Sequence, residues 1–225
     1  MKISEIFYSI QGEGVLAGVP SVFVRSSGCN LRCTWCDTPY TSWQPEGTEV
    51  STEAIVERVA GYGAKHVVLT GGEPMLFEES IALTRRFREM GLHITIETAG
   101  TVFKDVDCDL MSISPKLANS TPHHDPKWAV QHDKIRLQLE VLRRLMNLCD
   151  YQLKFVVSEP EDLNEIHPLV SSLDAEPGKV LLMPEGRDVE SLNSKSVWIA
   201  EECKKYGYRY SPRLHVLLWG DKRGV

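Results

Sequence analysis

The sequence predicts an α/β protein, a single domain folded as an open, partial (β/α) barrel. Short segments rich in apolar and β-branched residues alternate with segments of helical periodicity, and this alternation favours strands that pair in parallel. The repeats are too few for a closed barrel of eight units, and 225 residues suffice for one hydrophobic core. We therefore expect the functional residues in the loops that follow the carboxyl ends of the strands.

The elements follow one another in a regular order. The first predicted strand, Ser21–Ser27, is rich in β-branched residues and stops at Gly28. The segment 51–63 opens with Ser51 and Thr52 as candidate helix caps and spaces its apolar residues at helical intervals. Further strands are predicted at 66–72, 93–100, 109–114, 152–158 and 179–184, and further helices at 80–90, 134–148, 161–171 and 190–205.

One long stretch lacks periodicity. Residues 117–133 contain two prolines and three histidines, and this composition predicts a long loop that could serve as a lid. We expect its histidines, His123, His124 and His132, to be solvated, because histidines in a polar loop seldom bind a metal.

Composition argues against several kinds of partner. The formal net charge is −6 and no long run of Lys or Arg is present, which disfavours direct binding of nucleic acid. No apolar run approaches the ~18 residues of a membrane span, and the first residues lack a signal-peptide pattern. We therefore expect a cytoplasmic protein that does not bind a membrane.

The cysteines are unevenly distributed. Three of the six lie in the segment CNLRCTWC at 29–36, on the loop after the first strand. Three thiolates on one loop can hold three irons of a four-iron, four-sulfur (4Fe–4S) cluster and leave the fourth iron open. A structural zinc site would need a fourth Cys or His close by, and none is near in sequence. Cys108, Cys149 and Cys203 are scattered, and we expect them to be free, buried thiols.

The cysteine spacing resembles a known signature. Cys29, Cys33 and Cys36 form the pattern C-x3-C-x2-C with the aromatic Trp35 before the third cysteine, as in the radical S-adenosylmethionine (SAM) enzymes. Residues 71–74, Gly-Gly-Glu-Pro, resemble the second mark of that superfamily, where glycines let the backbone approach a ligand closely. The resemblance implies a partial barrel of the radical SAM type, a 4Fe–4S cluster on the three cysteines, and SAM as cofactor.

A narrower resemblance extends over nearly the whole chain, to the 7-carboxy-7-deazaguanine synthase family of queuosine and deazapurine biosynthesis. The segments that carry it are Ile10–Gly14, Phe23–Arg25, Cys36–Thr38, Glu97–Gly100, Ser114–Lys116 and Leu217–Val225. The implied reaction is that of a carbon–nitrogen lyase, which contracts the ring of 6-carboxy-5,6,7,8-tetrahydropterin with loss of ammonia. The implied organisation is one core domain over residues 1–225, with a substrate-binding N-terminal segment and C-terminal tail.

The resemblance also implies site residues. SAM contacts are expected from Trp35, Cys36, Asp37, Gly72, Ser114, Pro115, Lys116, Met183, Pro184, Glu185 and Gly186. Substrate contacts are expected from Ile10, Gln11, Gly12, Glu13, Arg25, Thr70, His215 and Val225. The planar fork of Arg25 suits the pterin carboxylate, and Gln11 and Glu13 suit its polar edges. A magnesium ion is expected on Thr38, with its other ligands from substrate and water.

Two residues have a role that the sequence leaves open or only implies. Glu97 lies at a predicted strand end, where a substrate contact and a structural ion pair are equally open. Trp219 is large enough to anchor the tail by burial, and the resemblance then brings the carboxylate of Val225 to the pterin.

Partners and rival functions complete the expectations. The resemblance suggests a homodimer with a flavodoxin-like electron donor and a small pterin substrate. One rival is an activating enzyme for a glycyl-radical protein, which would share the cluster but act on a large partner. The other is a zinc-stabilised binding module without catalysis.

Overall fold

A curved nine-stranded sheet forms the centre of the molecule, and the computed structural model describes all of residues 1–225. The strands are β1 (Lys2–Ile10), β2 (Pro20–Ser26), β3 (Thr48–Glu49), β4 (His66–Gly71), β5 (His93–Thr98), β6 (Leu110–Ile113), β7 (Asp150–Val157), β8 (Val180–Pro184) and β9 (Arg209–Tyr210). Their order is β3-β1-β2-β4-β5-β6-β7-β8-β9. The two edge strands do not pair with each other, so the predicted open, partial barrel is confirmed.

Most of the sheet is parallel. β1 is antiparallel to both β2 and β3, and every pair from β2 to β9 is parallel. The parallel strands therefore bring their carboxyl ends to the same edge of the sheet, where the loops of a (β/α) unit usually form a site.

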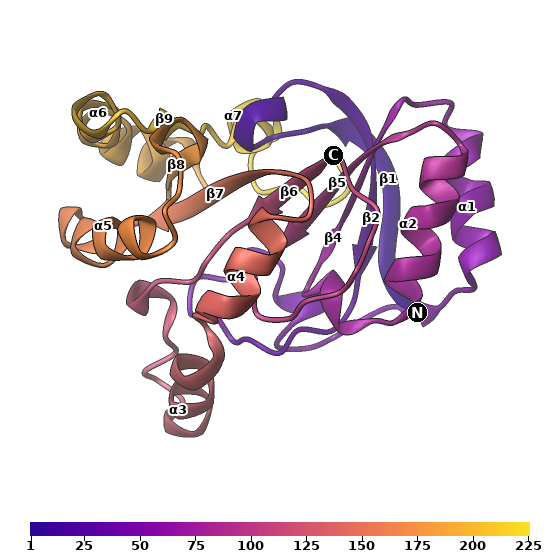
Figure 1. Cartoon of the computed structure of the whole chain (residues 1–225), viewed down its shortest axis with the longest axis horizontal. Coiled ribbons are helices and arrows are strands. Elements are labelled where there is room, and N and C mark those ends of the chain that lie inside the picture. The colour runs from indigo at the N-terminus through magenta and orange to yellow at the C-terminus, as the bar shows by residue number, and fades with distance from the viewer.

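Seven α-helices flank this sheet. They are α1 (Thr52–Gly61), α2 (Glu79–Glu89), α3 (Pro126–Ile135), α4 (Leu139–Met146), α5 (Leu163–Ser172), α6 (Val189–Tyr206) and α7 (Leu214–Trp219). Figure 1 shows α1 and α2 beside the β1–β4 half, α5 and α6 beside the β7–β9 half, and α3 projecting away from the sheet. None of the helices combines the length and the apolar character that a membrane span demands.

Local signals and burial explain these elements. The Ser51 hydroxyl accepts a hydrogen bond from the backbone N–H of Ala54 at 3.2 Å, as expected for a helix cap. The alternating strands bury Leu69 and Ile96 completely, and α2 packs the fully buried Phe87 against them within one core cluster. Burying each such side chain contributes roughly 1.5–3 kcal/mol, so the strands form a stable support for the loops at their ends.

Three segments differ from the sequence prediction. β1 was not among the predicted strands, although it pairs along its length with β2. The predicted loop at 117–133 contains most of α3, because Asp125 caps a helix that has Pro126 in its first turn. The terminal apolar run forms α7, and Trp219 is 41% exposed, so the expected anchoring of the tail by burial of this residue is wrong.

His132 on α3 is buried, contrary to the expectation of a solvated histidine. Its Nδ1 accepts a hydrogen bond from the backbone N–H of Arg32 at 3.2 Å, and its Nε2 lies 2.9 Å from the hydroxyl of Ser120. Burial lowers the pKa of His132 to about 4, so the neutral ring serves as a structural bridge between α3 and the cysteine loop.

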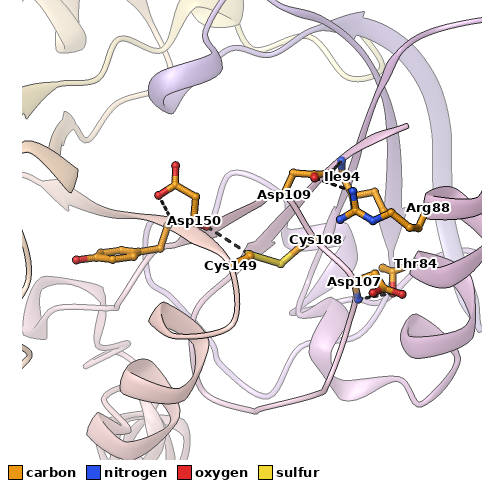
Figure 2. The surroundings of a disulfide bond; sticks show 9 residues. Thr84, Arg88, Ile94, Asp107, Cys108, Asp109, Cys149 and Asp150 are labelled. Atoms are coloured by element: carbon orange, nitrogen blue, oxygen red, sulfur yellow. Dashed lines mark hydrogen bonds and ion pairs between the residues drawn. A yellow bond between two sulfur atoms is a disulfide. The ribbon is translucent and has the colours of Figure 1, made fainter. Parts of the chain in front are cut away.

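Two of the scattered cysteines form a disulfide, which corrects the expectation of free thiols. Figure 2 shows Cys108, just before β6, bonded to Cys149, just before β7, with a Cα–Cα distance of 6.4 Å. Sequence spacing could not reveal this pair, because the parallel pairing of β6 with β7 brings together residues 41 positions apart. Cys203 is free and buried as expected. The disulfide lies at the amino ends of the strands, away from the carboxyl-end loops.

We expect reduction of this disulfide to lower the free energy of unfolding by about 2–4 kcal/mol, because the bond restricts a long loop of the unfolded chain. Chemical denaturation with and without a thiol reductant measures the difference, with Cys203→Ala as the control that keeps the bond. Cys108→Ser should show no dependence on reductant and should retain its full iron content. Equal stability of the wild-type protein in both conditions would contradict the prediction.

Candidate active site

A cavity of about 380 Å³ opens at the carboxyl ends of the strands. Almost all of the site residues predicted from the sequence line it. They are Ile10, Gln11, Gly12, Glu13, Arg25, Cys29, Cys33, Trp35, Cys36, Asp37, Thr38, Thr70, Gly72, Ser114, Lys116, Met183, Glu185, Gly186, His215 and Val225. Pro115 and Pro184 lie outside the wall; both are buried, and Pro184 ends β8. The fold thus gathers residues from the whole length of the chain around one space.

The loop after β2 brings three free thiols to this cavity. Cys29 and Cys36 are half-buried and Cys33 is buried. The backbone N–H of Leu31 lies 3.4 Å from the sulfur of Cys29. Burial raises the pKa of Cys29 and of Cys33 to about 12, so ionised sulfurs here require a strong positive partner. Thiolates bound to iron meet this requirement, and the donor set therefore fits a 4Fe–4S cluster.

A single-metal site is not formed. No three His, Cys, Asp or Glu side chains converge closely enough to hold one ion. A structural zinc site requires such convergence, because four ligand atoms surround one metal at about 2.0–2.3 Å.

The Gly-Gly-Glu-Pro turn after β4 packs tightly against the start of the cysteine loop. A Cβ atom on Gly72 would lie 2.3 Å from the carbonyl oxygen of Gly28, so only glycine fits there. The Glu73 side chain is fully buried, and it accepts hydrogen bonds from the Thr98 hydroxyl and from the backbone N–H of Ala99 at 2.8 Å. Glu73 thus fixes the turn to the end of β5, and Gly72 permits close backbone approach.

One wall of the cavity carries a lysine beside an indole. Lys116 donates hydrogen bonds to the carbonyl and the hydroxyl of Ser114 at 2.8 Å, and its ammonium lies 5.8 Å from the centroid of the Trp35 ring. The Trp35 indole N–H donates to the backbone oxygen of Asn119 at 3.1 Å, which fixes the ring. Across the cavity, Glu185 forms an ion pair with Lys195 at 2.8 Å.

Glu97 forms hydrogen bonds with Gln11 and Thr70, and we call these three cavity-lining residues the polar wall. One carboxylate oxygen accepts a hydrogen bond from Gln11 Nε2 at 3.0 Å, and the other accepts one from the Thr70 hydroxyl at 2.7 Å. Glu97 forms no ion pair, so the structural salt bridge that the sequence left open is absent. Glu97 and Thr70 both line the cavity at the carboxyl ends of their strands.

A group of paired charges lies at the base of this wall, and we name Glu13, Asp37, Lys154 and Arg213 the charge cluster. Lys154 pairs with Glu13, and Arg213 pairs with both Glu13 and Asp37. Burial opposes ionisation of Glu13, but the charges of Lys154 and Arg213 outweigh it and hold the pKa of Glu13 well below its usual value. The pKa of Asp37 is also lowered, because Arg213 outweighs the effect of burial.

His215 approaches the N-terminal segment closely. A Cβ atom on Gly12 would lie 2.0 Å from Nδ1 of His215, so a side chain at Gly12 would displace the imidazole. Burial lowers the pKa of His215 and favours the neutral ring. The imidazole of His215 therefore packs directly against the backbone of Gly12.

Comparison with known proteins agrees with this geometry. Residues 23–154 match the Radical SAM superfamily model. The chain is 47% identical to 7-carboxy-7-deazaguanine synthase of Halobacterium salinarum, over 98% of this chain and 91% of that protein. It is 45% identical to the synthase of Rhodopirellula baltica, over 100% of this chain and 89% of that protein. The chain belongs to the 7-carboxy-7-deazaguanine synthase family of radical SAM enzymes.

A solved structure of the same family shares the fold. QueE from Escherichia coli superimposes with a TM-score of 0.69 at 26% identity, over 93% of this chain and 92% of that chain. Membership of the synthase family makes the chain an enzyme, and the radical SAM family implies a 4Fe–4S cluster and SAM as its cofactors. The activating-enzyme alternative has no comparable support among these relatives.

Sequence reasoning missed two residues of this synthase-family site. Lys154 and Arg213 were not singled out, although both are buried and paired within the charge cluster. The signal for Lys154 was present, because a lysine inside the buried strand segment LKFVV requires an anionic partner. Arg213 lies outside any apolar pattern, and only the fold brings it to Asp37.

Proposed function

We propose that this chain converts 6-carboxy-5,6,7,8-tetrahydropterin to 7-carboxy-7-deazaguanine with release of ammonia. The observation that carries the proposal is the single cavity that contains both the three-cysteine loop and the polar wall of Gln11, Thr70 and Glu97. The atoms of the pterin balance those of the product and ammonia, so the ring contraction needs no net oxidant or reductant.

Cys29, Cys33 and Cys36 would hold the cluster and leave one iron free for SAM. When bound and reduced, the cluster would supply the electron for cleavage of SAM, and a hydrogen atom removed from carbon 6 of the pterin would be returned later in the cycle, since the ring contraction is redox-neutral. The protein positions both molecules and excludes water from the cavity.

We assign the SAM contacts to the part of the cavity beside the cysteine loop. They comprise Trp35, Cys36, Asp37, Gly72, Ser114, Lys116, Met183, Glu185 and Gly186. Pro115 and Pro184 lie next to these residues in the chain but outside the wall. Lys116 would balance the methionine carboxylate, since its ammonium lies on the wall beside Trp35. Asp37, held by Arg213, would help to orient the cofactor.

We assign the pterin to the polar wall, with contacts from Ile10 to Glu13, Arg25, Thr70, His215 and Val225. Arg25 keeps both terminal nitrogens free of intramolecular hydrogen bonds, so its planar fork can receive the carboxylate of the substrate. Glu97 is added to this set, because its carboxylate can accept hydrogen bonds from the amino-pyrimidine donors of the pterin.

We further propose a magnesium ion on Thr38, whose hydroxyl lies at the cavity near Cys36. Magnesium is expected to raise the rate, and Thr38→Ala should reduce this dependence while leaving cleavage of SAM without substrate intact. Thr34→Ala, on the exposed side of the same loop, is the matched control. Unchanged product formation after chelation and readdition of magnesium would exclude the ion from the reaction.

The assembly belongs to the same proposal. α7 leaves Leu217, Leu218 and Trp219 between 41% and 54% exposed, and this apolar surface supports a homodimer. We propose a flavodoxin-like protein as the electron donor. Thiols that must bind iron are kept reduced in the cytoplasm, and we therefore place the enzyme there. The same conditions would favour reduction of the Cys108–Cys149 disulfide, which the cluster does not require.

Anaerobic incubation tests the proposed function. Reconstituted enzyme is mixed with a reductant, SAM and 6-carboxy-5,6,7,8-tetrahydropterin, and the product is identified by mass. Formation of 7-carboxy-7-deazaguanine is the expected result. A colourless anaerobic preparation that contains zinc in place of iron would overturn the proposal.

A further inference from the structure

The C-terminal tail, residues 220–225, runs along the cavity wall and is held at two points. Asp221 pairs with Arg187, in the segment between β8 and α6. Arg223 reaches the opposite side of the cavity, where it contacts β1 and the segment before β3. The tail therefore crosses the open gap of the partial barrel. In Figure 1 the C-terminus lies near the middle of the view.

Arg223 forms an unusually complete set of contacts for a residue near a chain end. Its three guanidinium nitrogens donate to Glu5 Oε2 at 3.2 Å, to Glu46 Oε2 at 3.1 Å and to the Ser4 hydroxyl at 3.0 Å. The guanidinium also lies 3.8 Å from the centroid of the Tyr40 ring. A frayed terminus would not satisfy all of these nitrogens at once.

Glu5 has a second set of partners on the inner side. Its Oε1 accepts hydrogen bonds from Arg25 Nε at 2.7 Å and from the Tyr40 hydroxyl at 3.0 Å. The Glu5 side chain is only 14% exposed and that of Arg25 is 18% exposed. One carboxylate thus joins Arg25, which faces the cavity, to Arg223, which seats the tail.

An irregularity in β1 creates this arrangement. Ile3 pairs with Ser26 and Glu5 pairs with Arg25, so Ser4 is an extra residue in the ladder. The register shift sets Glu5 directly opposite Arg25, where their side chains share a face. It also lets Ser4 and Glu5 both reach Arg223, whereas successive residues of a regular strand point to opposite faces. Gly47 packs against the bulge so closely that a Cβ there would lie 2.3 Å from the carbonyl oxygen of Ile3.

We propose that Glu5 is a positioning residue that couples the two ends of the substrate site. Glu5 accepts a hydrogen bond from Nε of Arg25, which directs the two terminal guanidinium nitrogens of Arg25 toward the substrate carboxylate. Glu5 also holds the C-terminal tail in place through Arg223. Binding of the substrate at Arg25 and seating of Val225 over the cavity therefore favour each other. This inference rests on the proposed pterin site and adds a residue that makes no contact with the substrate.

Glu5→Gln tests the coupling, because glutamine keeps the shape and removes the charge that both arginines share. The expected result is an increase of about tenfold or more in KM for the pterin, with a smaller change in kcat. Cleavage of SAM without substrate should be unchanged. Glu46→Gln is the matched control, since it removes an exposed partner of Arg223 that does not contact Arg25, and its KM should stay within about threefold of wild type.

A second measurement follows the tail itself. Trypsin cleavage after Arg223 removes Gly224 and Val225, and intact mass records the loss. The pterin is expected to slow this cleavage in the wild-type enzyme and in Glu46→Gln, but not in Glu5→Gln. Arg223→Gln is the alternative test should Glu5→Gln fail to fold. It alters only the exposed end of the Glu5–Arg223 contact, and it should raise the KM for the pterin in the same way.

The outcomes separate the two proposals. A wild-type enzyme that makes no deazaguanine product overturns the proposed function. If the wild-type enzyme is active, a wild-type KM in both Glu5→Gln and Arg223→Gln, with protection of the tail by the pterin retained in Glu5→Gln, overturns the role of Glu5 alone.

Discussion

Replacing any one of Cys29, Cys33 or Cys36 by Ala is expected to abolish turnover. Each thiolate holds one iron of the cluster, and the remaining two sulfurs cannot keep the open iron in place for SAM. The three side chains share one loop and one cavity, and none is committed to a disulfide. Iron and sulfide content, the visible absorption of the reconstituted protein and the yield of deoxyadenosine measure the effect.

The remaining cysteines provide the controls. Cys203→Ala removes a buried thiol far along the chain, on α6, and should keep both the cluster and the activity. Retention of a full cluster and of activity in Cys33→Ala, together with loss of the cluster in Cys203→Ala, would refute the assignment of ligands.

Replacing Arg213 by Ala is expected to lower the free energy of unfolding by about 3–5 kcal/mol and to abolish detectable product. Its loss would leave Glu13 and Asp37 as charges in the cavity wall with too little compensation. It would also free the carbonyl of Gly186, which accepts a hydrogen bond from Arg213 at 2.6 Å. Arg86→Met, which removes a surface ion pair with Glu89, is the control and should cost less than about 1 kcal/mol.

The pH dependence of unfolding supplies an independent check on Arg213. The folded pKa of Glu13 lies below its ordinary value of 4.5, so the unfolded chain takes up a proton first as the pH falls. The stabilisation is therefore complete above about pH 4.5 and is lost progressively below it. The decrease in the free energy of unfolding at low pH should be smaller in Arg213→Ala, because part of the positive charge that lowers the pKa of Glu13 is gone. Equal slopes in both proteins would contradict the assignment.

Local patterns predicted most of the scaffold correctly because the physics behind them is local. β4 and β5 are short runs of buried β-branched residues, and α1 has a serine cap that the sequence displays directly. β1 escaped detection because only Ile3 and Ile6 of this strand are fully buried, three positions apart, so neither a continuous apolar run nor a regular alternation marks it. α3 begins at Asp125-Pro126, a signal that was present but was outweighed by the surrounding polar residues.

Some residues of the site could be predicted from local sequence patterns, and others only from the fold. The cysteine spacing and the Gly-Gly-Glu-Pro turn are short-range signals, and resemblance carried residues such as Gln11 and Val225 to the same cavity. Arg213 could not be predicted in this way, because its role depends on pairing with Glu13, which lies 200 positions away in the sequence. The disulfide and the network around Glu5 depend likewise on strand register, which a pattern within one segment does not contain.

The sequence by itself determined the chemistry available to this protein: three thiols on one loop, a glycine turn behind a strand, and the order of strands and helices that brings such loops together. Only the tertiary structure decided how charges far apart in the chain pair, because a buried carboxylate is stable only beside the cation that the fold delivers to it. It also decided that a bulge in β1 turns Glu5 toward both Arg25 and the C-terminal tail, since a shift of one residue in register changes the face to which a side chain points.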